Sequence, residues 1–234
     1  MACPSRELFT RIAGGYDALN RVLSCGTDIL WRRWALDALE ATLGGEAPAA
    51  VLDLATGTAD FAIAAAKHFP AARVTGLDAT PAMLEGGRRK IERERLADRV
   101  NLVEGDAEAL AFPAKTFDVA MCAFGFRNFP HPETALSALA TVLKPRGKLL
   151  ILELFRNESR LLAWFTSTWL RVVAWLFAHS HLGAYAYLRT SIETTRSADE
   201  FIDLAKAAGF QLRKKSFYLP SCTCLCFELD DVGN

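Results

Sequence analysis

The middle of the chain alternates between two patterns of apolar residues. Short apolar runs, rich in Val, Ile and Leu, are separated by segments in which apolar positions recur every three or four residues. Strands linked by helices in this way are typical of crossover connections in a parallel α/β sheet. The pattern predicts strands at 51–55, 73–77, 100–104, 117–122 and 147–154, helices at 59–69, 81–95, 107–110 and 132–143, and a turn at 144–147.

The sequence before the first predicted strand has helical spacing only. Apolar residues recur at three- and four-residue steps over residues 5–45, interrupted by a polar turn at 24–28. Thr27 or Asp28 in this turn is expected to be the N-cap of the second helix, because both side chains accept hydrogen bonds from free backbone N–H groups.

The sequence after the last predicted parallel strand changes again. Helices are expected at roughly 158–190 and at 197–208. Two strands at 210–218 and 222–229 are expected to pair as a closing antiparallel hairpin.

Composition and charge narrow the class of protein. The chain has 234 residues, enough for the core of one α/β domain, and its 27 Lys and Arg balance 27 Asp and Glu. A nucleic-acid partner would require a clustered basic surface. The basic runs at 88–90 and 213–215 are more typical of solvated faces, so no nucleic-acid partner is predicted.

Six cysteines in so long a chain indicate reduced thiols and a cytoplasmic location rather than a disulfide framework. Residues 1–11 contain no apolar run, so we expect no signal peptide. Cys222, Cys224 and Cys226 alternate and therefore share one face of the last strand. Three such thiols could bind a metal ion, but a buried strand face is the favoured interpretation, and no metal site is predicted.

The most apolar window of the chain covers residues 161–177. Arg171 lies in its middle, and Arg160 and His179 flank it. A charge at the centre of a bilayer costs roughly 2.5–3.5 kcal/mol on insertion scales, which disfavours a spanning helix. A helix that covers an apolar cavity, and a peripheral contact with the inner face of a membrane, both remain open.

The first candidate site lies at the end of the first predicted strand. Asp53 is followed by small residues around Gly57 and then by a helical pattern, so backbone N–H groups can approach a ligand closely. A dinucleotide fingerprint would need three glycines, but Ala55 and Ala59 flank Gly57. The turn therefore favours a nucleoside without phosphates, such as S-adenosylmethionine, over a pyrophosphate, and it disfavours a dehydrogenase.

Acidic residues follow the next two predicted strands. Asp78 comes about twenty residues after the glycine turn, where nucleotide-binding α/β folds place an acid on the ribose hydroxyls. Asp106 follows the third strand and is a candidate for the adenine amino group. The alternative for Asp78 is a helix-capping role before Pro81.

The fourth predicted strand ends in an aromatic segment that contains Arg127 and Asn128. This pair suits recognition of an oxygenated ring, although a salt-bridged Arg and a turn Asn are an alternative.

Several of these segments together resemble the ubiquinone/menaquinone-biosynthesis C-methyltransferases, a family of class I enzymes that use S-adenosylmethionine. The sheet segments belong to many such enzymes, whereas the N-terminal segment is specific to the family. The resemblance is carried by residues 53–60, 105–112, 124–128 and 142–145, and by 16–24 followed by Trp31.

The resemblance implies a Rossmann-like α/β fold, with a seven-stranded, mostly parallel sheet, helices on both faces and a C-terminal antiparallel hairpin. One methyltransferase domain over 1–234 is expected. Its parts are a helical N-terminal lid (1–45), a cofactor-binding core (51–154), a helical substrate-side insertion (158–208) and the closing hairpin (210–229).

By position, Thr58, Asp78, Asp106 and Ala107 match the family's cofactor contacts. The chain also departs from the family pattern: Ala123 stands where Ser is common and Ala59 where Gly is common. Asp28 replaces a His, and Arg146 replaces a Gly.

The activity implied is C-methylation of a polyprenylated hydroquinone, either demethylmenaquinol or the equivalent ubiquinone precursor. Arg127, whose pKa exceeds about 12, cannot be the base and is expected to stabilise the developing phenolate. Asn128 is expected to hold a ring oxygen, and Tyr16 to orient the ring or relay a proton. His131 is a possible base, but a lone loop His is more often merely solvated.

Two other functions remain open at this point: a methyltransferase with a different small acceptor, and a cofactor-binding accessory subunit of quinone biosynthesis. An apolar channel for the prenyl tail, walled by 161–177, is one reading of that segment. The sequence leaves the head group, the tail length and the formation of a homodimer undetermined.

Overall fold

The computed structural model describes residues 4–156, 168, 190–191, 194–218 and 222–231. Its strands are β1 (Ala50–Leu54), β2 (Arg73–Asp78), β3 (Val100–Glu104), β4 (Phe117–Ala123), β5 (Leu143–Glu153), β6 (Phe210–Tyr218) and β7 (Cys222–Leu229). Its helices are α1 (Pro4–Ile12), η1 (Ala13–Gly15), α2 (Tyr16–Leu23), α3 (Thr27–Glu40), α4 (Asp60–His68), α5 (Pro81–Arg93), η2 (Phe126–Asn128), α6 (Pro132–Val142) and α9 (Ala198–Ala207).

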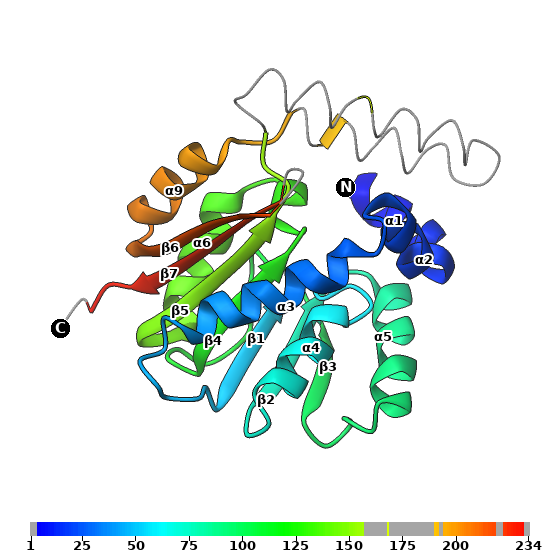
Figure 1. The fold of residues 1–234 in the computed structure, drawn as a ribbon, viewed down its shortest axis with the longest axis horizontal. Coiled ribbons are helices and arrows are strands. Elements are labelled where there is room, and N and C mark those ends of the chain that lie inside the picture. Colours follow the sequence, from blue (N-terminus) through cyan, green and yellow to red (C-terminus); the bar gives the residue numbers. More distant parts are fainter. Residues whose placement is uncertain (1–3, 157–167, 169–189, 192–193, 219–221, 232–234) are drawn as a thin grey trace.

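The strands form one seven-stranded sheet in the order β3-β2-β1-β4-β5-β7-β6 (Figure 1). Strands β1 to β5 are parallel, and β7 runs antiparallel between β5 and β6. The predicted fold class is therefore confirmed. All carboxyl ends of β1 to β5 lie at one edge of the sheet, the edge at which open α/β sheets bind ligands.

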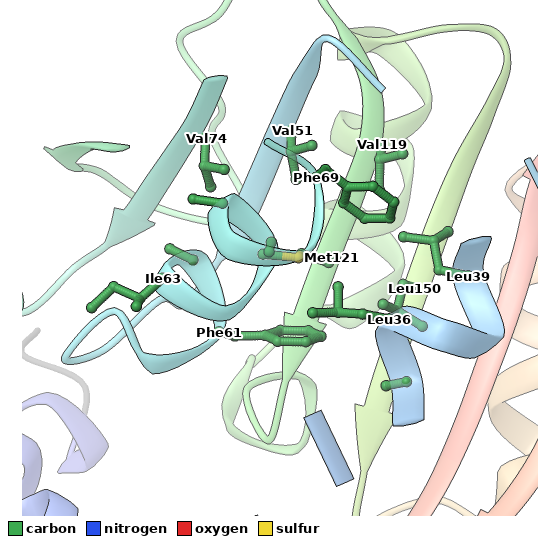
Figure 2. Packing of buried hydrophobic residues seen from close by; sticks show 14 of the residues in the cluster. Leu36, Leu39, Val51, Phe61, Ile63, Phe69, Val74, Val119, Met121 and Leu150 are labelled. Carbon is green, nitrogen blue, oxygen red and sulfur yellow. The ribbon is translucent and has the colours of Figure 1, made fainter. Parts of the chain in front are cut away.

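Helices cover both faces of the sheet (Figure 1). On one face α3 and α4 pack on the strands, with Leu36, Leu39 and Phe61 against the sheet residues (Figure 2). On the other face α6 and α9 contribute Leu136, Leu139 and Phe201. Burial on both faces explains why the parallel strands are almost continuously apolar.

Three local predictions are wrong. Residues 107–110 form a turn rather than a helix, because the Asp106 side chain accepts the Glu108 N–H (2.9 Å) and so competes with helical pairing. Residues 144–147 open β5 as a bulge, with Arg146 at φ 61. Gly26, at φ 77, precedes α3 in place of Thr27 or Asp28 as N-cap.

Cys222, Cys224 and Cys226 are buried on one face of β7, as the strand interpretation predicted. Burial raises the pKa of the Cys222 thiol well above its usual value, which keeps the sulfur protonated and a poor metal ligand. The five cysteines in the described part of the chain are free.

The apolar window 161–177, with the helices expected around it, lies outside the described residues apart from Thr168. Among the residues that the structure does describe, no helix has the length and apolar character needed to cross a bilayer.

Candidate functional site

The loop between β1 and α4 coils tightly although it contains one glycine. Ala55, Gly57 and Ala59 have φ values of 54, 56 and 65, so every second residue is left-handed. Glycine adopts this conformation without strain, whereas alanine does so at some cost. The chain thus has the backbone of a three-glycine turn, a feature that counting glycines did not predict.

Asp53 lies beneath this loop and is almost fully buried, with 1% of its surface exposed. Its carboxylate accepts the Thr56 hydroxyl hydrogen at 2.6 Å. Burial raises the pKa of Asp53 to about 7, against the Thr56 hydrogen bond and the positive charge of Arg32, which both lower it. The protonation of Asp53 is therefore sensitive near neutral pH to any charge that binds at this loop.

Asp78, at the end of β2, reaches back to the glycine loop. One carboxylate oxygen accepts the Gly57 N–H and the other the Thr80 N–H, both at 2.8 Å. Asp78 therefore holds the turn before α5, whose N-cap is Thr80, and does not itself cap that helix. Its predicted placement at the ligand edge is as expected.

Asp106 and Ala107 follow β3 on the same edge. The Gly105 N–H donates to the Asp78 carbonyl at 3.1 Å, which places this turn directly beside the end of β2. Asp106 is exposed and Ala107 is buried. The predicted run of acids along successive strand ends is thus present, with Asp106 two residues beyond its strand.

A small cavity of about 20 Å³ opens above the glycine loop. A space of this size holds about one water molecule and not a nucleoside. Ala123, at the end of β4, and Tyr16, at the start of α2, lie in its wall. Its lining consists of Tyr16, Arg32, Asp53, Ala55, Thr56, Gly57, Thr58, Asp60, Phe61 and Ala123.

Helix α2 covers this cavity through a network of ion pairs. The Thr58 hydroxyl donates to Asp17 of α2 (2.6 Å), and Lys90 of α5 contacts Asp17 (2.8 Å) and Thr58 (3.0 Å). Lys90 also pairs with Asp60, at the start of α4. Burial pushes the pKa of Asp60 up, but the charge and hydrogen bond of Lys90, with the nearby arginines, bring it below its usual value.

Arg32 and Asp28, on α3, extend the network toward β4. Asp28 is 3% exposed and accepts from Arg32, Arg21 and Ser24. The Arg32 guanidinium lies 5.5 Å from the centre of the Phe124 ring. Its Nε is buried and has no hydrogen-bond partner among the described residues, and the Arg32 side chain lines the cavity.

A second, larger cavity of about 390 Å³ lies on the other side of the segment after β4. Four phenylalanines and the Arg127 side chain line it, with Glu153 at the end of β5. Arg127 Nη1 donates to the Glu153 carboxylate and to the Phe124 carbonyl (2.8 Å). The phenylalanines of the wall are Phe126, Phe129, Phe155 and Phe201.

Asn128 and His131 lie just beyond this pair. The Asn128 amide donates to the Phe124 carbonyl at 3.3 Å, which holds the short helix η2 against the end of β4. The His131 side chain is 67% exposed, in agreement with the solvated interpretation. Phe124 itself is left-handed (φ 60), a strained conformation for a bulky residue and one that clusters at functional sites.

Sequence reasoning missed Arg32, Lys90, Asp60 and Glu153. Glu153 had one visible signal, a carboxylate inside an otherwise apolar strand. Arg32, Asp60 and Lys90 had no such signal, because a charged residue on a helix usually faces solvent.

Solved structures show which class of protein has this fold. A putative methyltransferase from Bacillus halodurans superposes with a TM-score of 0.59 and 24% identity, covering 78% of this chain and 71% of that protein. A putative methyltransferase of Haloferax volcanii, solved with the Trm112 activator, reaches 0.68 at 16% identity over 95% of this chain and 97% of that one. The fold is thus that of the methyltransferases.

Sequence comparison narrows this class to one family. Residues 4–223 match the model of the ubiE/COQ5 methyltransferase family. A demethylmenaquinone methyltransferase from Thermus thermophilus is 41% identical over 88% of this chain and 92% of that relative. A ubiquinone/menaquinone biosynthesis C-methyltransferase UbiE from Geobacter sulfurreducens is 38% identical over 88% and 80%. The chain belongs to the ubiE/COQ5 methyltransferase family, which confirms the resemblance.

Proposed function

We propose that this methyltransferase transfers the methyl group of S-adenosylmethionine to a ring carbon of a prenylated hydroquinone. The named relatives act in menaquinone or ubiquinone biosynthesis, which supports this substrate class. The observation that carries the proposal is the pair of cavities separated by the segment after β4. One is bordered by the glycine loop, and the other by aromatic rings and Arg127.

The residues in and beside the first cavity are the ones that would hold the cofactor. In the proposal the Asp78 carboxylate accepts the ribose hydroxyls, and Asp106 with Ala107 holds the adenine. Gly57 and Thr58 would contribute the loop backbone, with Asp53 and Ala123 at the floor and side. The buried, unpartnered Arg32 Nε also argues that this cavity takes a polar ligand. When bound, S-adenosylmethionine supplies a methyl group activated by its sulfonium.

The residues around the second cavity fit the hydroquinone ring. Arg127 carries a fixed positive charge in an aromatic wall, where it stabilises the negative charge that develops on the ring oxygen. Glu153 and the Phe124 carbonyl hold the guanidinium, so no reorganisation is needed when that charge appears. Asn128 positions a ring oxygen from the same short helix. In the methyl-transfer step the ring hydroxyl loses its proton to solvent and the ring carbon takes the methyl group as the S–C bond breaks. The ring C–H proton then leaves to restore the aromatic ring. The site residues contribute proximity, orientation and a positive charge to this step.

Tyr16 closes the cofactor side. Its ring lies over Gly57, where an added Cβ would be 3.9 Å from Tyr16 Cε1, and it packs edge-on against Phe9. In the proposal Tyr16 orients the ring and helps to exclude water. A prenylated substrate also implies that a cytoplasmic enzyme makes peripheral contact with the inner face of the membrane that holds this lipid.

The test is a methyl-transfer assay with labelled S-adenosylmethionine, offering demethylmenaquinol and a demethylated ubiquinol precursor side by side. Transfer of label to one quinol identifies the head group, and Arg127→Lys should lose at least about tenfold in rate because a lysine lacks the planar fork. The exposed Arg93→Lys is the matched control. Cofactor binding without transfer to either quinol would contradict the proposal and favour another acceptor or an accessory role.

A further inference from the structure

Arg32 is an unusual arginine because it is buried, with 7% of its surface exposed, and only partly paired. Its Nη1 donates to the Asp28 carboxylate (2.6 Å) and to the Asp28 carbonyl (3.1 Å). Its Nε has no partner. An unsatisfied buried donor carries a desolvation penalty that is larger when the group is charged, so a ligand is the expected partner.

The order of the strands indicates which part of a ligand reaches Arg32. Asp106 follows β3 and Asp78 ends β2, so the base and ribose lie over these two neighbouring strands. The next strands in the sheet are β1 and β4. Arg32 lines the cavity here, together with Asp53 of β1 and Ala123 of β4. A ligand that extends from β3 across the edge therefore brings its far end to Arg32.

In S-adenosylmethionine the end opposite to the adenine is an α-amino acid. We infer that Arg32 binds the carboxylate of this amino-acid end, through the edge of its guanidinium that carries Nε. The assignment rests on the proposed function and adds a residue of α3 to the cofactor site. A planar guanidinium is well suited to a carboxylate because it offers parallel N–H donors.

A second group in the same cavity supports this orientation. The Asp53 carboxyl lines the cavity together with Arg32, so the lining offers an acidic group as well as a guanidinium to the two charged ends of an amino acid. The ammonium group is attracted to the Asp53 side while the carboxylate meets Arg32. The other groups near Arg32 are Asp28, Asp60 and Arg21, and among these Asp60 and Asp28 already pair with Arg21.

Isothermal titration calorimetry with two ligands tests the assignment. Decarboxylated S-adenosylmethionine keeps the adenine, ribose, sulfonium and ammonium but lacks the carboxylate. The unmodified protein should bind S-adenosylmethionine about 10- to 100-fold more tightly than this analogue, as expected for a hydrogen bond between charged groups. Arg32→Gln should lose this factor for S-adenosylmethionine and bind the analogue within about twofold of the unmodified protein.

Two further variants control for folding and for general charge. Asp28 keeps Arg21 and Ser24 as partners when Arg32 is replaced, and Arg32→Lys retains the buried charge should the Gln variant not fold. Arg32→Lys should show an intermediate loss. Arg33→Gln changes the neighbouring exposed arginine and should leave both affinities unchanged.

Equal weakening of both ligands by Arg32→Gln and Arg32→Lys, or of neither, would overturn the assignment of Arg32. The proposed function would then still stand, because the unmodified protein binds S-adenosylmethionine. If the unmodified protein bound neither ligand, the cofactor itself would be wrong.

Discussion

Two groups of charged side chains at the carboxyl edge of the sheet are built in opposite ways. The group under α2 (Asp17, Arg21, Asp60 and Lys90) joins several elements through shared ion pairs. Its members on α2, Asp17 and Arg21, are 39% and 35% exposed, while Lys90 and Asp60 are 13% and 19% exposed. The other group is one pair, Arg127 and Glu153, exposed by 8% and 1%. Exposed pairs contribute little and exchange partners easily, whereas a buried pair cannot lose one member cheaply.

This difference assigns the two groups different roles. In the proposed function the cofactor approaches a cavity with room for about one water molecule, and α2, which contributes Tyr16 to its wall, is the element that we expect to move. Ion pairs near solvent suit a contact that opens and closes. In the same proposal Arg127 keeps one position relative to the substrate ring, and a buried pair suits that task.

The largest effect is expected from breaking the buried pair. Glu153→Gln leaves the Arg127 charge without its carboxylate and should lower the free energy of unfolding by about 3–5 kcal/mol. Urea denaturation measures this loss. Glu200→Gln is the matched control, since Glu200 pairs with Arg156 at the surface and its replacement should cost far less. A loss at Glu153 as small as that at Glu200 would contradict the contrast between the two groups.

The next effect is expected in the segment after β4, which lies between the two cavities. A Cβ on Gly125 would lie 2.7 Å from Cys122 Sγ and 2.8 Å from Ala55 Cβ. Gly125→Ala should therefore force the segment after β4 away from the glycine loop and destabilise the fold by about 1–3 kcal/mol.

Thermal unfolding of this variant against Gly14→Ala measures the effect, because a Cβ on Gly14 meets nothing within 4 Å. If both variants were equally stable, the close approach between the two loops would not exist.

A smaller effect on stability is expected from the group under α2. Lys90→Met removes the contacts to Asp17, Thr58 and Asp60, of which Asp60 keeps Arg21 as a partner. We expect a loss of about 1–2 kcal/mol, together with faster association of S-adenosylmethionine because α2 is held less firmly.

Stopped-flow binding measures the association rate, with Lys67→Met as control, since Lys67 forms an exposed pair with Glu94. An unchanged or slower association in Lys90→Met would show that α2 does not limit entry.

A further effect concerns the pH dependence of stability. The pKa of Asp53 is about 7 in the folded protein and near 3.8 unfolded, so the folded state binds the extra proton between these values. The contribution of Asp53 to the free energy of unfolding is therefore largest below about pH 4. It falls as the pH rises and is constant above about pH 7.

Asp53→Asn should remove this dependence. The difference in unfolding free energy between the variant and the parent, measured in urea, should grow in favour of the variant from pH 4 to 7. A difference that does not vary with pH would mean that Asp53 titrates normally.

The sequence was sufficient to predict the location of those site residues that directly follow a strand. Asp53, Gly57 and Asp78 could be placed together because parallel strands end at one edge, and Arg127 because it follows the fourth strand. Lys90 could not be predicted, since its partner Asp17 is 73 residues away and its helix reads as an ordinary solvated face. Helix packing, which short-range patterns do not encode, brings such charges together.

The central claim is that the group under α2 governs cofactor entry and that the Arg127–Glu153 pair governs the chemistry. The most direct test is the single-turnover rate of methyl transfer to the quinol at saturating S-adenosylmethionine, measured for Lys90→Met and Arg127→Lys. The account predicts a rate within about twofold of the parent for Lys90→Met and a loss of at least about tenfold for Arg127→Lys. The reverse order, or an equal loss in both variants, would contradict it.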